Sequence, residues 1–107
     1  MVKIDIVKDF SDTPGGRKKV DGPFSGEDFR ERFLEKYFHN QSDSEPIEIV
    51  LDGVIGYSTS FLEEAFGGLA RKYGKDKVLE RLKFISDEEP LLIEEIENYI
   101  NHPEGER

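Results

Sequence analysis

Residues 47–73 read IEIVLDGVIGYSTSFLEEAFGGLARKY and predict one strand followed by one helix. In residues 47–51, Ile and Leu occupy every second position, which is the period of a β-strand with one buried face. The sequence SFLE, which starts at Ser60, has the spacing of a capping box, so we expect a helix to begin there. Gly74 is placed to end that helix.

The segment before this unit predicts two strands and a helix. Residues 2–7 carry Val and Ile at alternate positions, which indicates a strand with a buried face. Residues 17–20 follow a turn-rich segment and predict a short edge strand, whose charges would protect it from pairing with other chains. Ser25 can cap a helix whose apolar stripe extends to Phe38.

The segment after the unit predicts another strand and a last helix. Residues 77–85 fit either a helical turn or a strand, and we favour a strand for the second half. Ser86 or Asp87 is expected to cap the last helix. The order β-β-α-β-α-β-α gives an α/β (α+β) fold, as a single domain over residues 1–101 with a frayed tail at 102–107.

The composition is typical of a small soluble globular domain. The chain has 107 residues, of which 36% are hydrophobic and 36% charged, and eight Phe and four Tyr supply bulk for a core. A net charge of −9 argues against nucleic acid as a ligand. No apolar run approaches the ~20 residues that span a membrane, and no secretion signal is recognisable at the start. We therefore expect no membrane association and a cytoplasmic location.

Most of the negative charge lies near the end of the sequence. Residues 1–44 and 45–85 each carry a net charge of −1, whereas residues 86–107 carry −7. The acidic run of residues 87–89 is expected in the first turn of the last helix, where the helix dipole stabilises negative charge. The functional alternative is a docking surface for a basic partner.

Three consecutive hydroxyl side chains precede the second predicted helix, at Ser58, Thr59 and Ser60. The simplest interpretation is that one of them caps the helix. A helix start also offers free amides to an anion, and phosphorylation there would add about −1.5 to −2 charges. The three residues are therefore candidate phosphorylation sites.

A glycine-rich segment around Gly15, Gly16 and Arg17 is the second candidate site. It lacks the Gly-Lys-Ser/Thr sequence of a Walker loop, so a hairpin turn followed by basic residues is the favoured interpretation. The alternative is a basic patch that binds a ligand or a partner.

The sequence lacks the side-chain groupings that most enzymes use. There is no cysteine, which excludes disulfides and thiolate metal sites. His39 is expected at a helix C-terminus, where the helix dipole favours it, and His102 is also near a helix end. Glu63 and Glu64 are adjacent, and neighbours on a helix point about 100° apart rather than facing each other as an acid and base. We therefore expect a non-enzymatic protein with no metal and no cofactor.

Four stretches of the sequence are distinctive together: YSTSFLEEAFGGL at residues 57–69, IDI at residues 4–6, FSDTPGGR at residues 10–17 and DGPFSG at residues 21–26. They resemble the STAS-like domain family of unknown function, a family of small prokaryotic domains, and the first stretch is the most specific. The resemblance extends to about Ile100. It implies a fold akin to anti-sigma-factor-antagonist domains, with a small mixed sheet and helices mainly on one face.

The resemblance also implies a regulatory role. In those relatives a histidine-kinase-like ATPase phosphorylates a serine in a loop that opens a helix, and phosphorylation releases the ATPase. The matching residues here are 58–61, with Ser58 at the position of an Asp and Phe61 at that of a Gly. The partner surface would include Tyr57, Phe61, Glu63 and Glu64.

Two functions follow as hypotheses. The first is a non-enzymatic regulatory module that binds such an ATPase, with Thr59, Ser60 or Ser58 as the phosphorylation site. The second is a small-ligand or nucleotide-binding domain that uses the glycine-rich loop and the helix N-terminus. A homodimer is left open.

Overall fold

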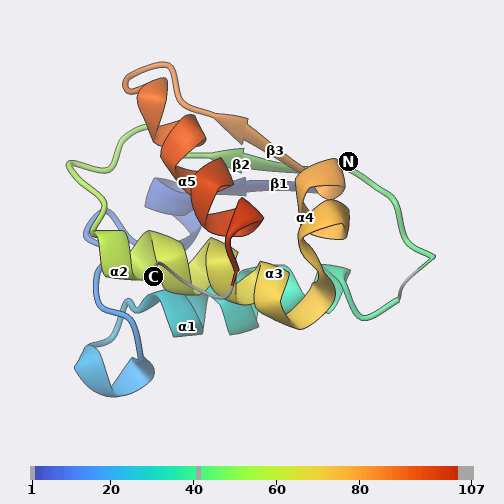
Figure 1. Cartoon of the computed structure of the whole chain (residues 1–107). Helices are drawn as coiled ribbons and strands as arrows, with labels where there is room; N and C mark the ends of the chain where they lie inside the picture. Colours follow the sequence, from blue (N-terminus) through green and yellow to red (C-terminus); the bar gives the residue numbers. More distant parts are fainter. Residues whose placement is uncertain (1, 41, 104–107) are drawn as a thin grey trace.

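Three short parallel strands form the sheet in a computed structural model that describes residues 2–40 and 42–103 (Figure 1). The strands are β1 (Val2–Asp5), β2 (Ile47–Val50) and β3 (Leu82–Ile85), and they lie in the order β1-β2-β3. The predicted strand in the second half of residues 77–85 is thus confirmed. Part of the predicted tail, residues 104–107, lies outside the described residues.

Two long helical stretches change their winding along their length. The first stretch consists of α1 (Gly26–Phe29), a π-helical turn (Arg30–Leu34) and a 3-10 turn (Glu35–Tyr37). The second consists of α2 (Thr59–Leu62), a π-helical turn (Glu63–Gly67) and α3 (Gly68–Tyr73). The remaining helical elements are α4 (Lys75–Arg81), α5 (Leu91–Asn101), a π-helical turn (Ile6–Phe10) and a 3-10 turn (Lys19–Asp21).

Two predicted helix ends are confirmed. Ser25 caps α1, because its Oγ accepts a hydrogen bond of 3.0 Å from the Asp28 amide. Gly74 ends α3, with a φ of 96°.

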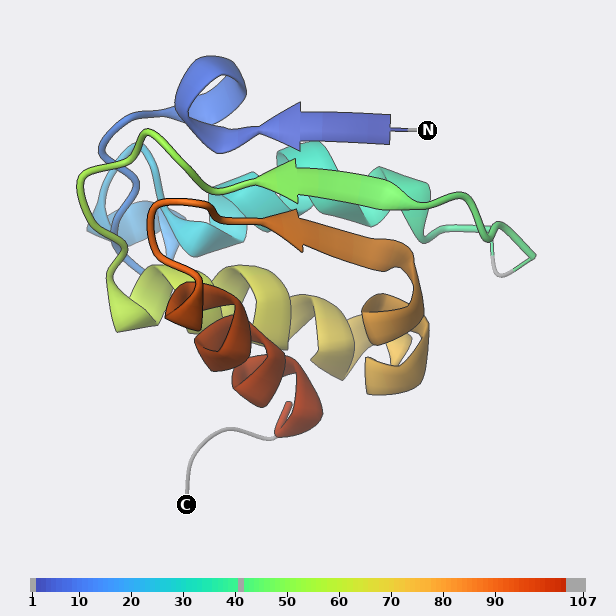
Figure 2. The ribbon, with the colours of Figure 1, turned by 90° about the horizontal axis from the view of Figure 1, so that it is seen from above.

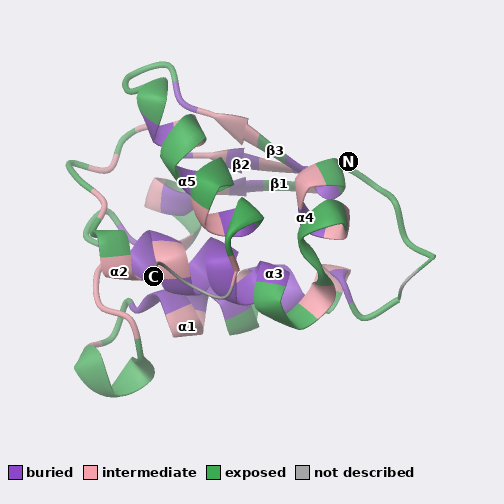
Figure 3. Cartoon of the chain, in the orientation of Figure 1, coloured by how far each residue is buried: buried purple, intermediate pink, exposed green. Residues whose placement is uncertain are grey.

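The helices cover one face of the sheet. In Figure 1, α1, α2 and α3 lie below the strands, and in Figure 2 the opposite face of the sheet is turned toward the viewer with α1 behind it. Ile47, Ile49 and Leu51 face the helical layer and are buried, whereas Lys3 and Lys83 belong to the other face and are exposed (Figure 3). The α/β class and the placement of helices mainly on one side are therefore confirmed.

Phenylalanine rings fill much of the space beneath the sheet. The ring of Phe29 is fully buried, and its centroid lies 5.1 Å from that of Phe10 and 5.8 Å from that of Phe61. Fully burying one such side chain contributes about 1.5–3 kcal/mol, so this cluster holds α1, α2 and the segment after β1 together.

The predicted strand at residues 17–20 is wrong, so the sheet is parallel rather than mixed. Residues Lys19–Asp21 form a 3-10 turn instead. The carbonyl of Arg17 accepts a hydrogen bond of 3.0 Å from the amide of Glu27. The segment is therefore bound to the start of α1 and does not pair with the sheet.

The predicted start of the second helical stretch is two residues too late. The cap is Ser58, whose Oγ accepts a hydrogen bond of 3.1 Å from the amide of Phe61. Thr59 is consequently the first helical residue, and Ser60 lies within the first turn. No helix in the described ranges is long and apolar enough to cross a membrane.

Candidate functional site

Two loops meet at the carboxyl ends of β2 and β3. They comprise residues 51–58 and 86–90, and together we call them the carboxyl-end site. Open α/β sheets generally bind their ligands beyond the carboxyl ends of the strands. A cavity of about 330 Å³ lies between the loops. It is lined by Leu51, Asp52, Val54, Ile55, Tyr57, Ser86, Glu88, Glu89 and Leu92.

Reciprocal hydrogen bonds between carboxylates and amides join the two loops. The carboxylate of Asp52 accepts hydrogen bonds of 3.0 Å from the amides of Asp87 and Glu88. The carboxylate of Glu88 in turn accepts one of 3.0 Å from the amide of Gly53. We call these three bonds the loop latch. It holds residues 51–58 in a defined position although they contain no helix or strand.

The latch also explains why α5 begins later than predicted. Ser86 and Asp87 do not cap it, because α5 starts at Leu91. The Ser86 hydroxyl donates a hydrogen bond of 2.7 Å to the carbonyl of Glu89, and the Asp87 amide donates one to the carboxylate of Asp52 in the other loop. The acidic residues 87–89 therefore precede α5, so the predicted stabilisation by its first turn is wrong.

Tyr57 supports the first loop from within. Its hydroxyl donates a hydrogen bond of 2.7 Å to the carbonyl of Leu51. Burial raises the pKa of the phenol, and the nearby carboxylates of Asp5, Asp52 and Glu88 raise it further. The phenol therefore keeps its proton and acts as a fixed donor, while its ring packs 6.1 Å from that of Phe61.

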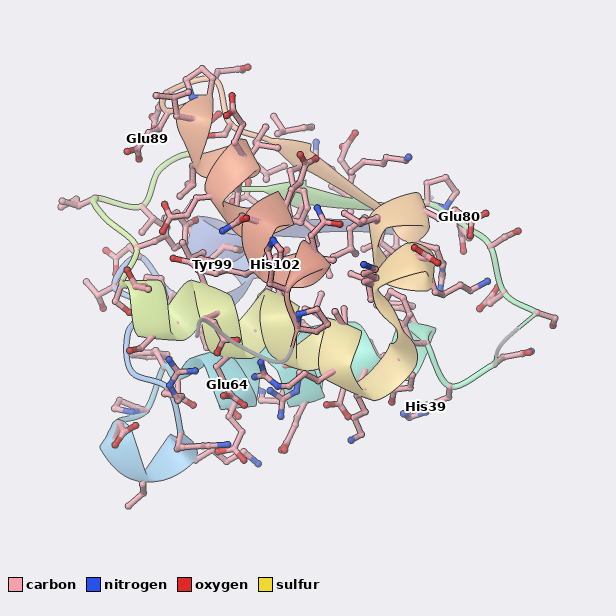
Figure 4. All side chains as sticks on the ribbon, in the orientation of Figure 1. His39, Glu64, Glu80, Glu89, Tyr99 and His102 are labelled. Atoms are coloured by element: carbon pink, nitrogen blue, oxygen red, sulfur yellow. The ribbon has the colours of Figure 1, made fainter. Side chains whose placement is uncertain are left out.

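The three hydroxyl residues differ in their surroundings. The hydroxyl of Ser58 is occupied as the helix cap, and Ser60 is half-buried. Thr59 is exposed, and its side chain lies near the phenol of Tyr99 on α5. The phenol of Tyr99, which is labelled in Figure 4, donates a hydrogen bond of 2.7 Å to the carboxylate of Glu95. Thr59 therefore lies at the contact between the start of α2 and α5.

The predicted partner-binding residues beyond Tyr57 lie inside the fold or in its ion pairs. Phe61 is fully buried and Glu64 is 4% exposed, so neither side chain is available to a partner in this conformation. Glu63 binds Arg17 and also accepts a hydrogen bond of 2.5 Å from Arg71. These contacts connect the glycine-rich segment to the second helical stretch.

Glu64 belongs to a buried ion network that joins the helices (Figure 4). Its carboxylate lies 2.6 Å from the guanidinium of Arg30, which also donates at 2.8 Å to Glu35. Lys18 approaches Glu64 to 3.4 Å, and Lys72 approaches Glu35 to 2.9 Å. Arg17 and Arg71 also lie 3.5 Å and 3.7 Å from Glu64, so each buried carboxylate has at least two cationic partners.

The network sets the charge state of Glu64. Burial raises the pKa of this carboxyl, but the hydrogen bond and charge of Arg30 and the proximity of Lys18 outweigh it, so the pKa lies below its ordinary value. The pKa of Glu35 is lowered in the same way by Lys72 and Arg30 against the effect of burial. Both carboxylates are therefore ionised at neutral pH and bind their partners as structural groups.

The glycine-rich segment uses its backbone groups within the fold. The amide of Gly15 donates 2.9 Å to the carbonyl of Phe24, and the carbonyl of Gly16 accepts 2.9 Å from the amide of Gly26. Since Arg17 is also paired with Glu63, this loop offers little to a phosphate or nucleotide.

Sequence reasoning missed the carboxyl-end site as a unit, because it placed residues 87–89 in a helix and did not bring them against Asp52. One signal was present: residues 37–70 and 84–106, which include both loops, contain no Lys or Arg. His39 and His102 lie on different parts of the molecule (Figure 4), and the described residues contain no group of His, Asp or Glu side chains suited to a metal ion.

Comparison with known proteins identifies the family. A family model for a STAS-like domain of unknown function matches residues 25–92, which is more than half of the chain and contains both loops of the carboxyl-end site. No curated protein and no solved structure matched. The chain belongs to the family of STAS-like domains of unknown function.

Proposed function

We propose that the chain is a non-enzymatic regulatory module that binds a partner protein through the carboxyl-end site and the start of α2. The partner we propose is a histidine-kinase-like ATPase that phosphorylates the chain. The observation that carries the proposal is the exposed hydroxyl of Thr59, which follows directly after the latched loop. Membership of the STAS-like family supports a regulatory role by fold.

Among the three hydroxyls, Thr59 is the proposed phosphate acceptor. Ser58 would lose the helix cap if it were modified, and Ser60 is half-buried. In the transfer, the Thr59 oxygen forms a bond to the γ-phosphorus of ATP, ADP leaves, and the hydroxyl proton is released. The product carries about −1.5 to −2 charges beside the Tyr99–Glu95 pair.

Repulsion between the phosphate and Glu95 gives the modification a structural effect. The phosphate and the Glu95 carboxylate would compete for the hydrogen bond that the Tyr99 phenol donates. We propose that this changes the contact between α2 and α5, and with it the affinity for the partner.

Phosphorylation by a co-encoded ATPase of this class tests the proposal. The chain is incubated with the ATPase and ATP, and intact mass and peptide fragmentation locate the phosphate. We expect one phosphate on Thr59, its loss in Thr59→Val, and its retention in the matched variant Ser60→Ala. No mass gain together with no complex formation would contradict the proposal.

A further inference from the structure

One large apolar side chain is exposed in the carboxyl-end site and a second is exposed at the residue that follows it in the sequence. Ile55, in the first loop, is 99% exposed, and Leu91, which follows the second loop, is 72% exposed. Among the described residues only Val20 and Phe24 are further large hydrophobic side chains classed as exposed. Ile55 also lines the cavity between the loops, so this exposed side chain is part of a concave surface and is not an isolated apolar residue.

The surroundings of Ile55 carry uncompensated negative charge. Asp52, Asp87, Glu88 and Glu89 all lie in the two loops, and none of them forms an ion pair with any residue that the structure describes. Glu89 lies at the outer end of this site (Figure 4). The two sequence segments that contain these loops, residues 37–70 and 84–106, have no Lys or Arg, so neither segment supplies a Lys or Arg side chain that could pair with these carboxylates.

The dipole of α5 accounts for only part of this charge. Glu89 directly precedes the N-cap Pro90, whereas Asp87 and Glu88 lie further from the helix along the chain and Asp52 belongs to the other loop. Asp52 and Glu88 each accept hydrogen bonds from backbone amides, which fixes the loops but leaves the negative charge in place. Ile55 is therefore presented on a pre-organised loop, and a partner would lose little binding energy in ordering it.

A second copy of the chain is a poor occupant for this surface. In a two-fold dimer the same patch meets itself, so four carboxylates of one copy would face four of the other. A basic surface has the opposite charge, and an apolar group on it would cover Ile55 and Leu91.

We infer that the carboxyl-end site docks a basic protein segment that carries an apolar side chain between Lys or Arg residues. Ile55 and Leu91 contact the apolar side chain, and the carboxylates of Glu89 and Asp87 hold the cations. This inference rests on the proposed function, because it specifies the chemistry of the partner surface at the same site.

Titration with defined peptides tests the inference. The probe is the peptide Lys-Leu-Lys-Lys-Leu-Lys, and the control peptide has Glu in place of every Lys. Binding is followed by the amide NMR shifts of the full chain at low and at physiological salt. We expect saturable shifts centred on Ile55, Glu89 and Leu91 with the basic peptide, weaker binding at higher salt, and no binding of the acidic peptide. Ile55→Ser should weaken binding about tenfold or more.

The matched control is Val20→Ser, because Val20 is 91% exposed but lies in the N-terminal segment, and it should leave the affinity unchanged. Equal binding by Ile55→Ser and the unsubstituted chain would overturn the inference, as would equal binding of both peptides. Concentration-dependent dimerisation that Ile55→Ser abolishes would assign the surface to a second copy instead.

The two proposals can fail separately. Phosphorylation of Thr59 without peptide binding would reject the basic docking surface and leave the regulatory function standing. A different outcome is that the peptide binds but the ATPase neither phosphorylates the chain nor forms a complex with it. That outcome would support the docking surface and reject the ATPase as the partner.

Discussion

At the scale of single residues, Gly26 shows how closely α1 approaches the second helical stretch. A Cβ atom at this position would lie 2.5 Å from the carbonyl oxygen of Phe61 and 3.1 Å from the amide nitrogen of Ala65. Both neighbours are backbone atoms of a helix, so neither can move away independently. The short side chain is therefore required by packing and not by a special backbone conformation.

Replacing this glycine should destabilise the chain. Alanine favours a helix by about 1 kcal/mol relative to glycine, but the added methyl group forces the helices apart at a cost of about 1–3 kcal/mol. Because the cost is the larger effect, we expect Gly26→Ala to lower the free energy of unfolding. Urea denaturation measures the change. Gly56→Ala is the control, because a Cβ there has no atom within 4 Å. A Gly26→Ala variant as stable as the control would contradict the proposed contact.

At the scale of elements, the sequence predicted the strands and helices better than their starts. Alternating apolar residues located β1 and β2, although the strand predicted over residues 2–7 ends at Asp5 and a π-helical turn follows. Periodic apolar positions located the two long helical stretches and α5, but α4 was missing from the predicted order. The start of α2 was missed because Ser58 and Ser60 are both good caps. The Glu63 carboxylate that would close a box at Ser60 is instead bound by Arg17 and Arg71, which are distant in sequence.

The errors at residues 17–20 and 86–89 have the same origin. Arg17 and Lys18 were read as solvated charges of an edge strand, yet they pair with Glu63 and Glu64 of another element. The amides of residues 87 and 88 find their acceptor in Asp52 rather than in a local cap. A sequence pattern reports local preferences, whereas long-range polar contacts fix both of these segments.

The loop latch is an element-scale feature whose removal should be local. Asp52→Ala deletes the acceptor of the Asp87 and Glu88 amides, so we expect faster hydrogen exchange at these two amides and a loss of about 1–2 kcal/mol, with the fold retained. Asp12→Ala, at an exposed carboxylate in another loop, is the control. Unchanged exchange at residues 87 and 88 would show that the latch does not restrain the loops.

At the scale of the whole molecule, charge is separated into two zones. Several cations pair with carboxylates of the helical layer, among them Arg30 and Lys72, whereas the carboxyl-end site retains unpaired carboxylates. The charge count along the sequence assigns most of the acidic excess to residues 86–107, and it gives residues 45–85, which include Ser58–Ser60, a net charge of only −1. Folding brings Glu88 and Glu89 to the same cavity as Tyr57, which directly precedes Ser58–Ser60, and a count along the sequence could not reveal this.

The helical zone should control the response to acid. The pKa values of Glu35, Glu63 and Glu64 are lowered in the folded chain, so their contribution to stability is complete above the unfolded pKa of about 4.3 and is lost as pH falls through the lower folded values. We expect the free energy of unfolding to decline below about pH 4.3.

Glu64→Gln should isolate one part of this response. It removes the carboxylate nearest to buried Arg30 and leaves Glu35 as the ion-pair partner of that guanidinium, so it should cost about 1–3 kcal/mol near neutral pH. The difference from the unsubstituted chain should shrink in acid, where Glu64 is protonated anyway. Urea denaturation across the pH range measures both effects, with exposed Glu94→Gln as control. A difference that does not depend on pH would exclude a pKa shift at Glu64.

The open face of the sheet has a practical consequence. Parallel sheets are ordinarily covered on both faces, but here Lys3, Glu48 and Lys83 lie in one register row that alternates in sign across the strands. Because side chains alternate between faces, changes at Lys3 or Lys83 do not reach the helical layer. Because the chain contains no cysteine, Lys3→Cys or Lys83→Cys would give one selective point for attaching a fluorophore or a sensor surface and would leave the carboxyl-end site free for binding measurements.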